Sequence, residues 1–118
     1  MNIKDKIQIC KVVTQAILAD AQITDSERSF IEKLMDKYEL DEDQRKEVLS
    51  RNIGDDPAEM ARKITSFESK NELIVELAMA VAVDGEISSS ERALLDRVAT
   101  VFMISKVDLE LLLQAAIA

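Results

Sequence analysis

The stretch AVDGEISSSER occupies residues 82–92, and a related stretch, LADAQITDSER, occupies residues 18–28. Each contains an aspartate, an isoleucine three residues later, and then a Ser or Thr followed three residues on by a Glu. A Ser or Thr with a Glu at that spacing forms a capping box, which satisfies free backbone N–H groups at the start of a helix. Each stretch is therefore predicted to be a junction at which one helix ends and the next begins.

A shift of 64 residues aligns 16–49 with 80–113, and the apolar positions of the two segments then match in phase. Identical residues meet at Ala16 and Ala80, Asp20 and Asp84, Ile23 and Ile87, Glu27 and Glu91, Arg28 and Arg92, and Leu49 and Leu113. This repetition predicts two three-helix repeats, at about 3–52 and 70–117, joined by a linking helix at about 57–67. Two such units can bury their apolar faces on each other about a pseudo-twofold axis.

Helix-start signals and apolar periodicity predict seven helices in a single domain that spans residues 1–118. The predicted helices cover about 3–20, 25–38, 42–52, 57–67, 70–84, 89–103 and 106–117. Their capping pairs are Thr24 with Glu27, Asp41 with Gln44, Asp56 with Glu59, Ser69 with Glu72, and Ser88 with Glu91, with Asn2 and Ser105 as looser caps. Only 2 Gly and 1 Pro are present and no hairpin signal occurs, so we expect an all-α bundle with a central fifth helix.

Composition narrows the function classes. The net charge of −8 argues against nucleic acid and anionic lipid as partners, because both require clustered Lys and Arg. There is one cysteine, Cys10, and no histidine, which excludes an internal disulfide and the common nucleophile–His pairs. The longest apolar run, 73–83, contains Glu76 and is shorter than the roughly 20 residues of a membrane span. We therefore expect a cytoplasmic protein without direct membrane insertion, whose partner is another protein; its oligomeric state stays open.

The second junction also resembles the back half of a calcium-binding loop. Aligned in that way, Asp84, Gly85 and Glu91 occupy positions 5, 6 and 12 of an EF-hand loop. Positions 1 and 3, which should carry oxygen ligands, then fall on Ala80 and Ala82. The sequence therefore excludes an ordinary EF-hand.

A different cation site is predicted at the four repeated acids, Asp20, Glu27, Asp84 and Glu91. The two glutamates are explained as members of capping boxes. The two aspartates each fall in the last turn of an apolar helix, where the helix dipole disfavours an acid. Two explanations stay open: Arg28 and Arg92 neutralise the aspartates, or the pseudo-twofold brings the four carboxylates together around Ca²⁺ or Mg²⁺.

The two junctions, ADAQITDSER (19–28) and VDGEISSSER (83–92), together with the apolar helices around them, resemble the tellurite-resistance TerB family. A related domain occurs in a membrane-anchored DnaJ-type co-chaperone. The resemblance covers nearly the whole chain and implies an all-helical, metal-associated domain, with the four repeated acids as the matching positions. Ala21 stands where the second copy has Gly85, and alanine resists a left-handed conformation by about 1 kcal/mol, so the two turns are expected to differ.

Two hypotheses for function follow. The first is a non-enzymatic, TerB-like module that binds a divalent cation and belongs to a tellurite or stress response. The second is a helical protein–protein adaptor in which the acids only cap helices. For single residues, Glu76 is expected to face solvent or meet a basic residue, and Cys10 is expected to fill the core. The same is expected of Met35, Met60, Met79 and Met103.

Overall fold

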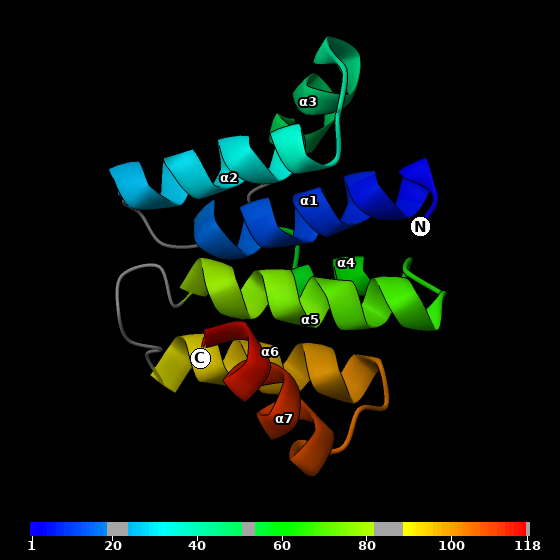
Figure 1. The fold of residues 1–118 in the computed structure, drawn as a ribbon, viewed down its shortest axis with the longest axis vertical. Coiled ribbons are helices and arrows are strands. Elements are labelled where there is room, and N and C mark those ends of the chain that lie inside the picture. Colours follow the sequence, from blue (N-terminus) through cyan, green and yellow to red (C-terminus); the bar gives the residue numbers. More distant parts are fainter. Residues whose placement is uncertain (19–23, 51–53, 82–88, 118) are drawn as a thin grey trace.

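The computed structural model describes residues 1–18, 24–50, 54–81 and 89–117, and these residues form seven α-helices and no strand (Figure 1). The helices are α1 (Ile3–Leu18), α2 (Asp25–Lys37), α3 (Glu42–Leu49), α4 (Pro57–Ala61), α5 (Phe67–Val81), α6 (Ser89–Val101) and α7 (Lys106–Ile117). The prediction of an all-α bundle is confirmed.

Helices α1 and α5 lie side by side in the middle of the bundle (Figure 1). Helices α2 and α3 pack on α1, whereas α6 and α7 pack on α5. The short α4 contacts both α1 and α6. The centre is filled by apolar side chains from both halves, including Ile9, Val12, Val13, Leu73, Ile74, Leu77, Leu95 and Val98, all of which are fully buried. Cys10 belongs to this core, as expected.

Four predicted helix starts are confirmed by their hydrogen bonds. Thr24 and Glu27 form both bonds of a capping box, and so do Asp41 and Gln44. The side chains of Asn2 and Ser105 each accept a hydrogen bond from the backbone N–H three residues later. The cap predicted at Ser88 lies outside the described residues.

The predicted start of the fifth helix is wrong by three residues. Helix α5 begins at Phe67 because Ser66, and not Ser69, is its cap: the Ser69 N–H donates to Ser66 Oγ at 3.1 Å. The Ser69 hydroxyl is buried and donates instead to Asp5 Oδ2 of α1 at 2.6 Å. Glu72, the expected partner of Ser69, is bound by other side chains.

The linking helix is shorter than predicted. It ends at Ala61 rather than near residue 67, and Asp56 accepts from Ala58 N–H instead of pairing with Glu59. Glu59 binds Arg62 at 2.9 Å. Pro57 occupies the first turn, as expected. The third helix is also shorter than predicted, because it ends at Leu49 with Ser50 as its C-cap rather than at 52. The predicted helix ends at 20 and 84 lie outside the described residues.

The two halves share their local backbone structure. A shift of 64 residues lays α2 on α6 with the same limits and lays the starts of α1 and α3 on those of α5 and α7. Helices α2 and α6 are each followed, at the corner, by a residue with left-handed φ, 55° at Glu39 and 59° at Met103. The closing hydrogen bonds also correspond, from Leu40 N–H to Met35 O and from Ile104 N–H to Ala99 O. The pseudo-twofold axis itself stays a prediction.

Candidate functional site

Of the four acids predicted to hold a cation, two are within the described residues. Glu27 is buried, and its Oε1 accepts from Thr24 N–H at 3.0 Å, so its carboxylate serves the capping box. Glu91 lies in the first turn of α6. Asp20 and Asp84 lie outside the described residues, as do Ala21 and Gly85 of the two turns.

No group of three His, Cys, Asp or Glu side chains that could hold a metal ion occurs within residues 1–18, 24–50, 54–81 and 89–117. Arg92 binds Asp96 at 3.3 Å and also Glu110 of α7, and the bond to Glu110 raises the pKa of its guanidinium. The four-carboxylate site and the neutralisation of the aspartates by arginine both stay predictions.

An ionic cluster that includes one buried carboxylate joins α2 to α5. Glu76 is 2% exposed, and Lys37 Nζ lies 2.5 Å from its Oε1 and 3.0 Å from Oε1 of Glu72. The Tyr38 hydroxyl donates to Glu72 at 3.1 Å. The expectation that Glu76 faces solvent or meets a basic residue is thus confirmed, because it meets Lys37.

Burial raises the pKa of Glu76 even though Lys37 opposes the shift. Burial acts in the same direction on Glu72, but hydrogen bonds from Lys37 and Tyr38 bring its pKa below the ordinary value. Lys37 keeps a raised pKa because its bonds to the two carboxylates outweigh its partial burial. The cluster thus holds one cation between two acids and links the two halves electrostatically.

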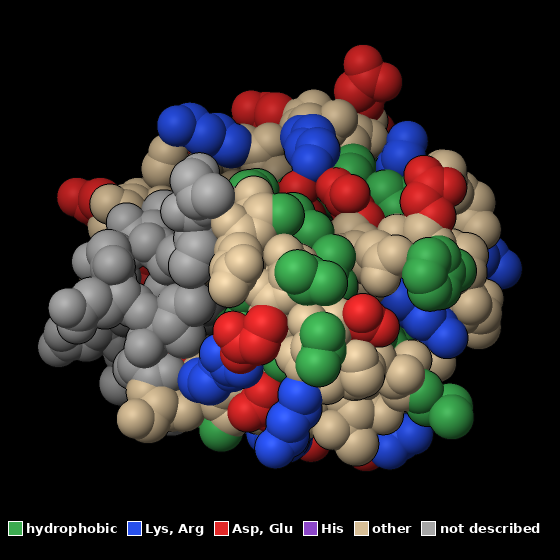
Figure 2. All heavy atoms as spheres, turned by 60° about the horizontal axis from the view of Figure 1, so that its bottom comes forward, with side chains coloured by type: hydrophobic (Ala, Val, Ile, Leu, Met, Phe, Trp, Pro, Cys, Tyr) green, Lys and Arg blue, Asp and Glu red, His purple; other side chains and the backbone are tan. Residues whose placement is uncertain are grey.

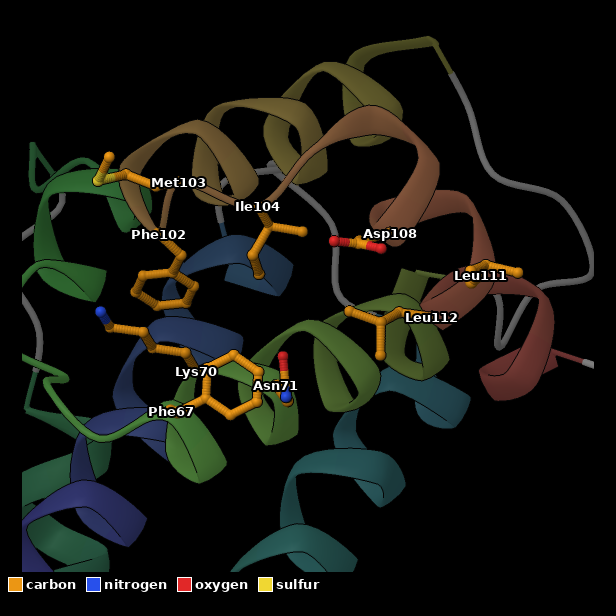
Figure 3. Close-up of a pocket in the computed structure, with 9 residues that line it drawn as sticks. All are labelled: Phe67, Lys70, Asn71, Phe102, Met103, Ile104, Asp108, Leu111 and Leu112. Carbon is orange, nitrogen blue, oxygen red and sulfur yellow. The ribbon is translucent and has the colours of Figure 1, made fainter.

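The structure reveals a second candidate site that the sequence reasoning missed. A hollow of about 410 Å³ opens between the start of α5, the corner between α6 and α7, and α7 itself (Figure 3). It is lined by Phe67, Lys70, Asn71, Phe102, Met103, Ile104, Asp108, Leu111 and Leu112. We call this hollow the α5–α7 groove.

Apolar side chains stand exposed along the groove. Phe67 is 77% exposed, Met103 92%, Leu111 59%, and the neighbouring Val107 70%. The prediction that Met103 fills the core is wrong: it has a left-handed φ at the corner after α6 and lies exposed at the edge of the groove (Figure 3). The rings of Phe67 and Phe102 lie near one end of the groove, with Lys70 between them (Figure 3). Lys70 Nζ is 5.7 Å from the centre of the Phe102 ring.

The apolar character of this surface is specific to the second half of the chain. The 64-residue shift pairs Met103, Val107 and Leu111 with Glu39, Asp43 and Glu47, all of which are also exposed. The same backbone positions thus carry three acids in the first half and three apolar side chains in the second. This contrast is visible in the sequence, but the repeat is recognised from residues that match, and these positions differ between the two copies.

Figure 2, in which the side formed by α6 and α7 is turned forward, shows apolar side chains on the surface among acids and bases. The fold is that of a small all-α bundle domain, and an apolar groove lies on its surface.

The chain belongs to the TerB family, because the family model described as tellurite resistance protein TerB matches residues 6–114. The resemblance seen at the two junctions is thereby confirmed. No curated protein and no solved structure matches the chain. TerB domains are generally not enzymes. Within the described part of the chain, none of the helices has the length and apolar character needed to cross a bilayer.

Proposed function

We propose that this TerB-family chain is a non-catalytic adaptor that binds another protein through the α5–α7 groove. One observation carries the proposal: the exposed positions 103, 107 and 111 are apolar, although the fold accommodates acids at the matching positions 39, 43 and 47. A single exposed apolar side chain is ordinary, whereas several of them grouped beside one hollow are typical of an interaction surface. The single cysteine, which is free and buried, supports a place in a reducing compartment such as the cytoplasm.

Site-directed photocrosslinking tests the adaptor function. A photoreactive phenylalanine analogue is placed at Val107 in one variant and at its matched position Asp43 in another, and both are irradiated in the cells that make the protein. We expect Val107 to form a discrete crosslinked product with one protein and Asp43 to form none. Adding Met103→Glu and Leu111→Glu to the Val107 variant should abolish the product. Crosslinks that are absent, or the same from both positions, would overturn the adaptor function.

A second candidate function rests on the repetition of Asp20 at Asp84 and of Glu27 at Glu91. In this proposal the four carboxylates of the two junctions bind Ca²⁺ or Mg²⁺ and connect the chain to a tellurite or stress response. The repeated aspartates support it, because the sequence predicts both in the last turn of a helix, where an acid is unfavourable and needs compensation. Because the Glu27 carboxylate already takes part in a capping box, we expect such a cation to have fewer than four of these carboxylates as ligands.

A further inference from the structure

We infer that the occupant of the α5–α7 groove is a short amphipathic helix with a basic flank, supplied by a partner protein. This inference rests on the adaptor function proposed above and specifies the chemistry of the partner.

The spacing of the apolar residues supports a helical occupant. Val107 and Leu111 lie four residues apart on α7, which places both side chains on one face with their Cα atoms about 6 Å apart along the helix axis. Phe67 from α5 and Met103 from the preceding corner extend the apolar surface beyond this pair. Two or three turns of a second helix, with apolar residues at i, i+4 and i+7, match a surface of this kind.

Charge supports the basic flank. Asp108 is the acid that lines the groove, and its carboxylate forms no ion pair with any residue in the described part of the chain. Lys70, the basic residue of the lining, already faces the ring of Phe102. A Lys or Arg beside the apolar residues of the partner would therefore meet an available carboxylate.

The net charge argues against other occupants. A charge of −8 repels a second copy of the chain and also an anionic bilayer, whereas it attracts a basic segment and speeds its association. The matching positions of the first half help to define the site, because α3 begins at the residue that corresponds to the start of α7 but carries acids at these positions. One of them, Glu47, is bound to Lys11 at 2.8 Å.

Peptide display provides the test. A library of random 16-residue peptides is selected against the chain, with prior depletion on the variant Met103→Glu, Val107→Asp, Leu111→Glu. These substitutions install the residues that the first half carries at the same backbone positions, so we expect the fold to be retained, which circular dichroism checks. We expect the enriched peptides to share apolar residues at helical spacing and an excess of Lys and Arg. Enriched peptides that are acidic or lack helical spacing would overturn the inference.

The affinity of the best enriched peptide for single variants then separates the apolar contribution to binding from the electrostatic one. Leu111→Glu should weaken binding about tenfold or more. Asp108→Asn, which removes the charge and keeps the size of the side chain, should weaken it about two- to fivefold and reduce its dependence on salt. The matched control Asp43→Asn, Glu47→Gln should leave the affinity unchanged. An Asp108→Asn variant with wild-type affinity and salt dependence would overturn the basic flank.

Two further measurements exclude other occupants. A dimer seen by sedimentation in the wild type and lost in the triple variant would identify a second copy instead. Sedimentation of the wild type, but not the triple variant, with phosphatidylcholine vesicles would identify a lipid surface. A crosslinked partner at Val107 that carries no basic amphipathic helix would overturn this inference while leaving the adaptor function intact. Loss of the crosslink would overturn both.

Discussion

Single residues show how this fold accommodates charge inside its core. Glu76 is fully enclosed, and at the matching position of the first half the chain has Val12. Lys37 likewise corresponds to Val101. The two residues of this ionic contact thus correspond in sequence to two valines of the other half. A buried charge is tolerated only if it is paired, so we expect the stability of the protein to depend on Lys37.

Removing Lys37 should destabilise the protein in a pH-dependent manner. In Lys37→Val, Glu76 keeps its burial but loses its cation, and we expect the free energy of unfolding at pH 7.5 to fall by about 1–3 kcal/mol. The raised pKa of Glu76 means that the folded state binds this proton more tightly than the unfolded state. As the pH falls, protonation of Glu76 therefore reduces the free-energy cost of burying it without a cation. The loss should therefore be smaller at pH 4.5.

Urea unfolding at the two pH values measures this effect. The double variant Lys37→Val, Glu76→Val, which installs the residues that the chain carries at the positions shifted by 64, serves as the control and should regain much of the stability at pH 7.5. The explanation fails if the single variant loses the same free energy at both pH values or if the double variant is no more stable than the single one.

At the scale of the elements, each helix start depends on which side chain accepts a hydrogen bond from the free backbone N–H groups. Thr24 and Asp41 cap as their sequence pattern predicts. Ser69 fits the same pattern, but its hydroxyl donates to Asp5, a residue 64 positions earlier. Ser66 caps α5 in its place. The corners after α2 and α6 both require a left-handed residue, yet neither carries a glycine.

Replacement of these corner residues by glycine should separate stability from binding. A glycine adopts a left-handed φ more readily, so Met103→Gly and Glu39→Gly are each expected to raise the free energy of unfolding by about 0.5–1 kcal/mol. Met103→Gly should at the same time weaken binding of the enriched peptide, whereas Glu39→Gly should not. Urea unfolding and a peptide titration on both variants check this. Destabilisation by both substitutions would show that these side chains contribute packing instead.

At the scale of the whole molecule, a cation site at the repeated acids requires that the two halves bring their junctions together. If they do, addition of Ca²⁺ or Mg²⁺ should raise the thermal melting temperature progressively by mass action. The double variant Asp20→Ala, Asp84→Ala should abolish this rise, while Asp43→Ala, an exposed acid far along the sequence, should retain it. Differential scanning calorimetry over a cation series measures the effect. A double variant that responds as strongly as the wild type would leave only the adaptor function.

The sequence alone determined the helical class, the TerB resemblance, most helix starts and the correspondence between α2 and α6, because these follow from local caps and from apolar periodicity. Tertiary structure decided the true start of α5, the partner of Glu76 and the position of Met103 on the surface. The reason is physical: Asp5 and Ser69, Lys37 and Glu76, and the walls of the α5–α7 groove are distant in the chain. Only the packing of one helix on another brings such residues into contact.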